Sequence, residues 1–282
     1  MVAMLKVTVL AAWVLFLQNL SASAQSLTKA EACKRLEAAA VEILIPPKPN
    51  HPETAGGGTG FIVSLDGWIL TAGHVVTDRV TNKYYPQIEV LLPGDPGGFE
   101  RPAVVVAGAS IVDFALLKVT DLPKDYLFYH RKRTLEALPL GDEKNLVLGS
   151  DIAFFGSPMA AGLPEQMCLF GSVAGIIQPE IYYQGAAVGG MSGGPIMSLD
   201  TGKVVGIVKR RTVDIPALAQ VGDQFYEDVG QPTAGHGDGA SRKALSGVLQ
   251  ILDTQFNNGI GAGVSISVPK FAFEAAQRQD HR

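Results

Sequence analysis

Three residues of the sequence have the types and settings that nucleophilic acyl transfer requires. Ser192 lies in the stretch GGMSGGPI, whose glycines suit a nucleophile held on a tight turn. His74 follows an apolar run in ILTAGHVV, where a histidine can project into a cleft and serve as a base. Asp113 is the lone carboxylate of SIVDFALLKV, and a charge in apolar surroundings needs a partner such as an imidazole N–H. These side chains could form one catalytic triad.

The glycines beside the serine add donors for the charge that develops in such a reaction. The backbone N–H groups of Gly190 and Ser192 can converge on an oxyanion, and glycine tolerates the torsions that this turn needs. Each motif also has a structural interpretation when taken alone. The serine could lie in a flexible loop, and His74 could be a structural histidine in a turn.

The chain order of these residues separates two hydrolase arrangements. The letters GMSGG fit both the G-x-S-x-G elbow of α/β-hydrolases and a G-x-S-G-G-P loop. An α/β-hydrolase runs Ser, Asp, His, with a helix after the elbow, whereas here histidine comes first and Pro195 follows the serine loop. The later histidines, His236 and His281, lie in a glycine-rich loop and a terminal tail. Chain order and sequence context therefore favour the G-x-S-G-G-P loop over the α/β-hydrolase elbow.

Short apolar runs separated by turn residues must position these side chains. From Gly60 onward the pattern is typical of an all-β protein, and Asp66-Gly67 within GFIVSLDGWILTAGH predicts a hairpin. Many short strands of this kind indicate a barrel or a sandwich. Further strands are predicted at 87–92, 103–107, 114–119, 151–155, 167–177, 194–197, 204–208 and 263–268.

Two segments depart from the β pattern. Residues 26–44 predict a short N-terminal helix, because apolar residues recur at spacings of three and four, and Ser26 or Thr28 could cap its start. Residues 209–258 form an insert near the C-terminus that combines a glycine-rich loop with a helix. The apolar face of that helix is expected to pack on its own domain, and docking of a partner is the alternative.

The start of the chain and its charge bear on compartment and partners. Residues 1–24 read as a signal peptide, with Lys6, an apolar run at 7–17 and the small residues ASA before the cleavage site. The run is short for a membrane span. We therefore expect a secreted or periplasmic protein without membrane contact after cleavage. The net charge of −4 argues against nucleic acid as a partner.

The cysteines leave one question open. Cys33 and Cys168 both follow the signal, and export to an oxidising compartment permits a disulfide between them. Buried free thiols are the alternative. No cluster with metal-ligand spacing stands out in the sequence, so neither a metal nor a cofactor is expected.

The blocks TAGHVV, DFALLKV and GMSGGPI resemble the three motif blocks of trypsin-like serine proteases. GTGFIVSLDGWILTAGHVV, GGPIMSLDTGKVVGIV and GAGVSISVP are most similar to the HtrA (high-temperature-requirement) branch of that clan. The resemblance implies a protease domain over 25–282, with two antiparallel six-stranded-type β-barrels at 45–140 and 141–270. His74 and Asp113 would come from the first barrel and Ser192 from the second.

The resemblance also implies an activity. The protein would be a serine endopeptidase that cleaves protein or peptide substrates through an acyl-enzyme. Ala186, Val188 and Gly189 would form the pocket for the residue before the scissile bond. Met191 stands where chymotrypsin-type enzymes have an aspartate that pairs with a new N-terminus, so activation by that ion pair is not expected. No room is expected for the PDZ domain that many HtrA proteins append. The alternative is a non-catalytic binding or adaptor protein with the same fold.

Overall fold

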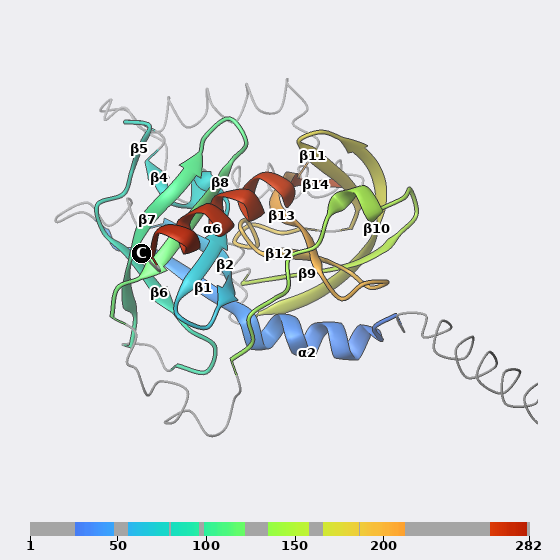
Figure 1. Ribbon diagram of the computed structural model, residues 1–282, viewed down its shortest axis with the longest axis horizontal. Helices are drawn as coiled ribbons and strands as arrows, with labels where there is room; N and C mark the ends of the chain where they lie inside the picture. The colour runs from blue at the N-terminus through green and yellow to red at the C-terminus, as the bar shows by residue number, and fades with distance from the viewer. Residues whose placement is uncertain are drawn as a thin grey trace, which may run out of the picture.

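The computed structural model describes residues 26–47, 56–78, 80–95, 99–121, 135–157, 166–185, 187–211 and 260–280. Most strands of this part lie in two closed antiparallel barrels of six strands each, which Figure 1 shows side by side. The predicted all-β class with two barrels is therefore confirmed. The predicted signal peptide lies outside the described residues, and so does the insert beyond Arg211.

All strands of the first barrel precede those of the second along the chain, so the chain completes one barrel before it enters the other. The first barrel has the order β1 (Ala40–Ile45), β2 (Gly56–Ser64), β3 (Trp68–Thr71), β8 (Phe114–Val119), β7 (Arg101–Ala109) and β6 (Ile88–Leu91). The second has the order β10 (Met167–Ile177), β11 (Glu180–Gln184), β14 (Ile260–Ser265), β13 (Val204–Arg211), β12 (Pro195–Ser198) and β9 (Asp151–Gly156). A small hairpin, β4 (Thr77–Asp78) and β5 (Lys83–Tyr84), follows a 3-10 turn, η2 (Gly73–Val75).

The predicted hairpin at Asp66-Gly67 joins β2 to β3. Gly67 has a φ of 97°, a torsion that costs glycine little, and its N–H donates to the carbonyl of Ser64 at 3.1 Å. Every residue of β3 is buried, because this strand lies between β2 and β8 in the barrel wall. The tight turn and the buried strand bring the chain to the start of η2.

The helix predicted over 26–44 was too long. Helix α2 spans Lys29–Ala39, and residues 40–45 form strand β1, so the first barrel starts earlier than residue 45. Val41, Ile43 and Ile45 are buried by strand alternation, whereas Ala40 and Ile43 also continue the three- and four-residue spacing of the helix. Pairing with β2 and β6 decides between the two patterns, because β1 closes the barrel. Thr28 caps α2, as one of the two predicted caps.

Helix α2 is followed in the sequence by β1 of the first barrel, but it packs against strands of the second barrel. Its buried side chains, Ala32, Leu36 and Ala39, face β9 and β10, along which the helix lies in Figure 1. A disulfide joins Cys33 of α2 to Cys168 of β10. The covalent bond and the apolar contact therefore connect the two barrels.

A C-terminal helix, α6 (Ser267–Asp280), was not predicted, and the strand expected at 263–268 ends instead at Ser265. Figure 1 shows α6, in red, crossing the first barrel beside β7 and β8. Phe273 meets the ring of Trp68 edge to face at 6.2 Å, and Lys118 bridges to Asp280 at 3.2 Å. The chain thus returns from the second barrel to cover the first.

Candidate active site

His74 lies in η2, immediately after the buried strand β3. The short turn lifts the ring out of the barrel wall, and its side chain is 32% exposed. The ring Nδ1 lies 2.9 Å from Oδ2 of Asp113 and 3.1 Å from Oδ1. The structure thus brings these two predicted residues together through one nitrogen of the ring.

Asp113 ends the turn between β7 and β8 in an unusual backbone conformation. Its φ is 65°, a region that non-glycine residues seldom occupy, and its N–H donates to the carbonyl of Ala109 at 2.7 Å. The carboxylate also accepts the backbone N–H of His74 at 2.8 Å. Asp113 is 8% exposed, so these hydrogen bonds replace most of the water that its charge would otherwise require.

Ser192 lies at the start of the second barrel's β12 hairpin, between the two turns that its glycines make. Its Oγ donates to the backbone carbonyl of Lys209 on β13 at 3.2 Å. Among the hydrogen bonds of the described residues, none joins Ser192 to His74. The serine hydroxyl is therefore hydrogen-bonded to the backbone of β13 and not to the imidazole of His74.

The turn before Ser192 leaves two backbone donors available. Met191 N–H donates to the carbonyl of Val188 at 3.1 Å, and Gly190 has a φ of 95°, which are the marks of a type II turn. The N–H groups of Gly190 and Ser192 take no partner among the described residues. Such a pair of free donors next to a serine can stabilise a developing oxyanion.

Thr59 of β2 joins the serine loop to the first barrel, and sequence reasoning did not find it. Its N–H donates to the carbonyl of Ser192 and its Oγ1 to the carbonyl of Gly190, each at 2.8 Å. The same Oγ1 accepts the N–H of Ser157 at 2.9 Å, and the Thr59 carbonyl accepts Oγ1 of Thr71 at 2.7 Å. Thr59 is 1% exposed. The only signal in the sequence was its place between two glycines in GTGF.

The remaining predicted residues fall in different environments. Met191 is fully buried in the second barrel's core, so an apolar contact occupies the place expected for an ion-pairing aspartate. Val188 is half-buried and Gly189 exposed, both in the turn before the serine. Ala186 lies outside the described residues. Neither Val188 nor Gly189 supplies a charge to the predicted substrate pocket.

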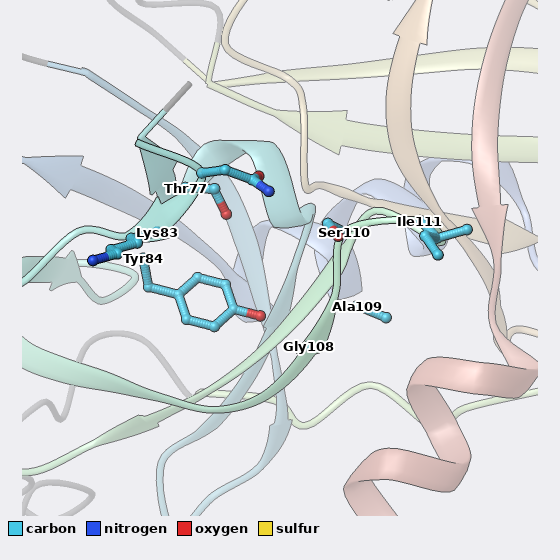
Figure 2. Close-up of a pocket in the computed structure, with 8 residues that line it drawn as sticks. Thr77, Lys83, Tyr84, Gly108, Ala109, Ser110 and Ile111 are labelled. Atoms are coloured by element: carbon cyan, nitrogen blue, oxygen red, sulfur yellow. The ribbon is translucent and has the colours of Figure 1, made fainter. Parts of the chain in front are cut away.

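A cavity of about 590 Å³ lies between the segments that follow His74 and precede Asp113. Figure 2 shows the Tyr84 ring reaching across it from β5 toward Gly108 of β7. A Cβ on Gly108 would lie 2.4 Å from the phenol oxygen and 2.9 Å from the carbonyl oxygen of Phe114, so a side chain here would be crowded. Ile111, on the far rim, is 91% exposed. The cavity thus extends the surface available beside the His74–Asp113 pair.

Two general properties of the described residues also bear on function. No helix among them is long and apolar enough to cross a membrane. Within the same residues, no group of three or more His, Cys, Asp or Glu side chains could hold a metal ion.

Comparison with known proteins agrees with this geometry. Residues 58–207 match the family model described as "Trypsin-like peptidase domain". The chain is 32% identical over 179 residues to "Serine protease HTRA2, mitochondrial" of Bos taurus, covering 60% of this chain and 35% of the relative. It is 27% identical over 184 residues to "Probable periplasmic serine endoprotease DegP-like" of Brucella suis, covering 64% and 32%.

A third relative, "Serine protease HTRA4" of Mus musculus, is 32% identical over 197 residues, which cover 64% of this chain and 36% of the relative. The chain spans about a third of the length of these curated relatives. The family model covers more than half of the chain, from within β2 to the middle of β13. The chain therefore belongs to the trypsin-like peptidase domain family, and its relatives place it with the HtrA type.

Proposed function

We propose that the protein is an exported serine endopeptidase that hydrolyses peptide bonds through an acyl-enzyme. The observation that carries this proposal is the hydrogen-bonded pair of His74 and Asp113, with the Ser192 loop tied to the same barrel by Thr59. The family membership of the chain supports the same chemistry.

In the proposed reaction, His74 carries the proton both when the acyl-enzyme forms and when it is hydrolysed. Ser192 Oγ attacks the carbonyl carbon of the scissile bond while its proton passes to Nε2 of His74, and Asp113 stabilises the imidazolium. The C–N bond then breaks as His74 gives that proton to the leaving amine. Water adds to the remaining ester by the same route, which releases the acid and restores Ser192.

The N–H groups of Gly190 and Ser192 would hold the oxyanion of each tetrahedral intermediate. Neither group donates to another partner among the described residues, so neither has a hydrogen bond to give up when the charge develops. Removal of one such donor typically raises the activation free energy by about 3 to 4 kcal/mol.

The contact of Ser192 Oγ with the Lys209 carbonyl favours a second candidate function, a binding protein whose serine is not activated. For catalysis the hydroxyl has to rotate from Lys209 to His74. A fluorophosphonate probe distinguishes the two functions, because it labels only a serine that a base activates. We expect labelling of the wild type and none of Ser192→Ala or His74→Ala. Absence of labelling in the folded wild type would favour the binding protein.

The substrate pocket proposed around Ala186, Val188 and Gly189 carries no charge, so we propose small or medium apolar residues before the scissile bond. A Lys or Arg side chain would lose its hydration there without gaining a counter-ion. A peptide library should show cleavage after Val, Ala or Leu. Preferential cleavage after Lys or Arg would contradict this pocket assignment.

Export to the periplasm is the proposed location, supported by the signal-like residues 1–24 and by the periplasmic name of the Brucella suis relative. N-terminal sequencing of protein from a periplasmic fraction should begin at Gln25. Retention of the whole leader in the cytoplasmic fraction would contradict export.

A further inference from the structure

A second cavity, of about 630 Å³, lies beside the oxyanion turn on the side of the first barrel. Gly190 lines it together with Gly57 and Gly58 of β2. A Cβ on Gly58 would lie 2.9 Å from the backbone carbonyl oxygen of Ser192, so the cavity reaches the proposed nucleophile's main chain. Neither Val188 nor Gly189 lines it. This cavity is therefore separate from the wall assigned to the residue before the scissile bond.

Three carboxylates, those of Glu42, Glu89 and Glu100, line this cavity, and the first two come from the adjacent strands β1 and β6. In the pairing of β1 with β6, Glu42 lies opposite Leu91 and Leu44 lies opposite Glu89. Residues opposite each other, and residues two apart on one strand, share a face of the sheet. Glu42 and Glu89 therefore lie on the same outward face, and both are half-buried and line the cavity.

Neutral groups are the only hydrogen-bond partners of the Glu42 and Glu89 carboxylates in the described part of the chain. Glu42 accepts from Ser157 Oγ at 3.0 Å, and Glu89 accepts from Gln87 Nε2 at 2.8 Å. No Lys or Arg is among the described residues that line the cavity. Two negative charges at a partly desolvated wall thus lack a cation, and a bound cation would supply it.

The other walls suit a long aliphatic stem. Leu44, Pro46 and Pro47 line the cavity beside the carboxylates. Lys and Arg side chains pack their methylene groups on apolar surface while the charged end reaches a polar partner. The combination of apolar walls and carboxylates matches a basic side chain better than an apolar or an acidic one.

We propose that this cavity binds a Lys or Arg side chain of the substrate, within the first two residues after the scissile bond. The inference rests on the proposed function, which assigns the residues before that bond to the other side of Gly190. Glu42 and Glu89 are then specificity-determining residues for the leaving-group side. Specificity would be divided, with apolar residues preferred before the bond and basic residues preferred after it.

Three peptides with a common acyl side and Lys, Ala or Glu in the first two positions after the scissile bond test this proposal. We expect kcat/KM to be about tenfold higher for the Lys peptide than for the Ala peptide, and lowest for the Glu peptide. The preference should shrink as salt is added, because screening weakens the charge pairs. Equal kcat/KM for the Lys and Glu peptides would overturn the proposal.

Charge-removing variants identify the residues responsible. Glu42→Gln and Glu89→Gln keep an oxygen acceptor for Ser157 and Gln87, and each should lower the Lys-over-Glu ratio. The double variant should lower the ratio furthest, although Glu100 keeps one negative charge on the cavity wall. Glu274→Gln removes the same charge from an exposed position on α6 and should leave the ratio unchanged. Thermal unfolding checks that each variant is folded, and an unchanged ratio in the folded double variant would overturn the proposal.

Failure of the proposed function can be told apart from failure of this inference. If the wild type cleaves none of the peptides, the proposed function fails, and the cavity is judged by binding alone. Fluorescence anisotropy with Ser192→Ala protein then compares labelled Lys and Glu peptides. Tighter binding of the Lys peptide, reduced when Glu42 and Glu89 are replaced, supports the cavity assignment, and equal binding of both peptides rejects it.

Discussion

Asp113 accepts hydrogen bonds from His74 twice, once from the ring Nδ1 and once from the backbone N–H. The first contact orients the imidazole, and the second fixes the main chain of η2 that carries it. One buried carboxylate thus sets both the direction of the ring and the position of its backbone.

We predict that Asp113→Asn lowers kcat by about 10⁴-fold, because an amide that donates to Nδ1 selects the wrong tautomer. The left-handed φ of 65° is acceptable to asparagine, so the fold should remain. Steady-state kinetics with circular dichroism as the control measure both effects. A kcat close to that of the wild type would remove Asp113 from the proposed triad.

Replacement of Thr59 should slow the reaction by misplacing the serine loop. Thr59→Val keeps the shape but removes the hydroxyl that donates to Gly190 and accepts from Ser157. A displacement of about 1 Å can cost about 100-fold in rate, so we expect a loss of that order in kcat with little change in KM. Thr59→Ser restores the hydroxyl and should restore kcat. Equal kinetics for the Val and Ser variants would leave Thr59 a purely structural role.

Gly193→Ala should be strongly destabilising. Its φ is 90°, and an added Cβ would lie 2.0 Å from the Thr59 carbonyl oxygen, where the backbone cannot yield locally. Gly149→Ala is the matched control, with a φ of 86° and nothing within 4 Å of the added Cβ. In this control the free energy of unfolding should fall by only about 1 to 2 kcal/mol, which is the cost of a left-handed backbone conformation for alanine. Urea unfolding compares them, and equal losses would contradict the steric argument.

Removal of the disulfide should lower the free energy of unfolding. Cys33 and Cys168 are separated by 135 residues, so the bond greatly restricts the unfolded chain. A loss of about 2 to 4 kcal/mol is expected for the double Cys→Ser variant. A reducing agent should lower the wild type's melting temperature and leave the variant's unchanged. A reductant effect of equal size on both proteins would contradict this account.

Acid should weaken the anchoring of α6. Burial by itself would raise the pKa of Glu143, but hydrogen bonds from Ser267, from its own backbone and from Gln178 together lower it below the ordinary 4.5. A pKa lower in the folded than in the unfolded state stabilises the protein above pH 4.5, and this contribution is lost as pH falls through the lowered value.

Glu143→Gln should therefore flatten the fall in unfolding free energy between about pH 6 and about pH 3. The exposed Glu274→Gln serves as its charge-matched control. Urea titrations across that range measure the slope for each protein, and identical slopes for wild type and Glu143→Gln would contradict the prediction.

Much of the fold could be predicted because the strands carry local signals. The apolar runs at 114–119 and 167–177 coincide with β8 and β10, and the Asp66-Gly67 dipeptide marks the hairpin before His74. Strand β1 was assigned to a helix, since Ala40 and Ile43 also fit the helical spacing and only pairing with β2 and β6 decides. Strand β11 was not predicted, and α6 was missed because so few of its residues are buried.

The sequence could propose His74, Asp113 and Ser192 as a candidate site because their chemistry depends on residue type, and the structure pairs the first two. Thr59 could not be found this way, because its role comes from contacts with Gly190 and Ser157, which are far from it in sequence. The same is true of Glu42 and Glu89, which share a face only through the register of β1 with β6.

Helix α2 runs directly into β1, yet its buried side chains and its disulfide lie on the second barrel. Any hinge motion that separates the barrels must therefore either pull Leu36 out of its contact or bend the chain at Ala40. His74 and Ser192 come from different barrels. The distance between them is therefore limited by α2 and its disulfide, although neither residue contacts that helix. Reduction of the disulfide would accordingly widen the range of geometries that the site samples before it would unfold either barrel.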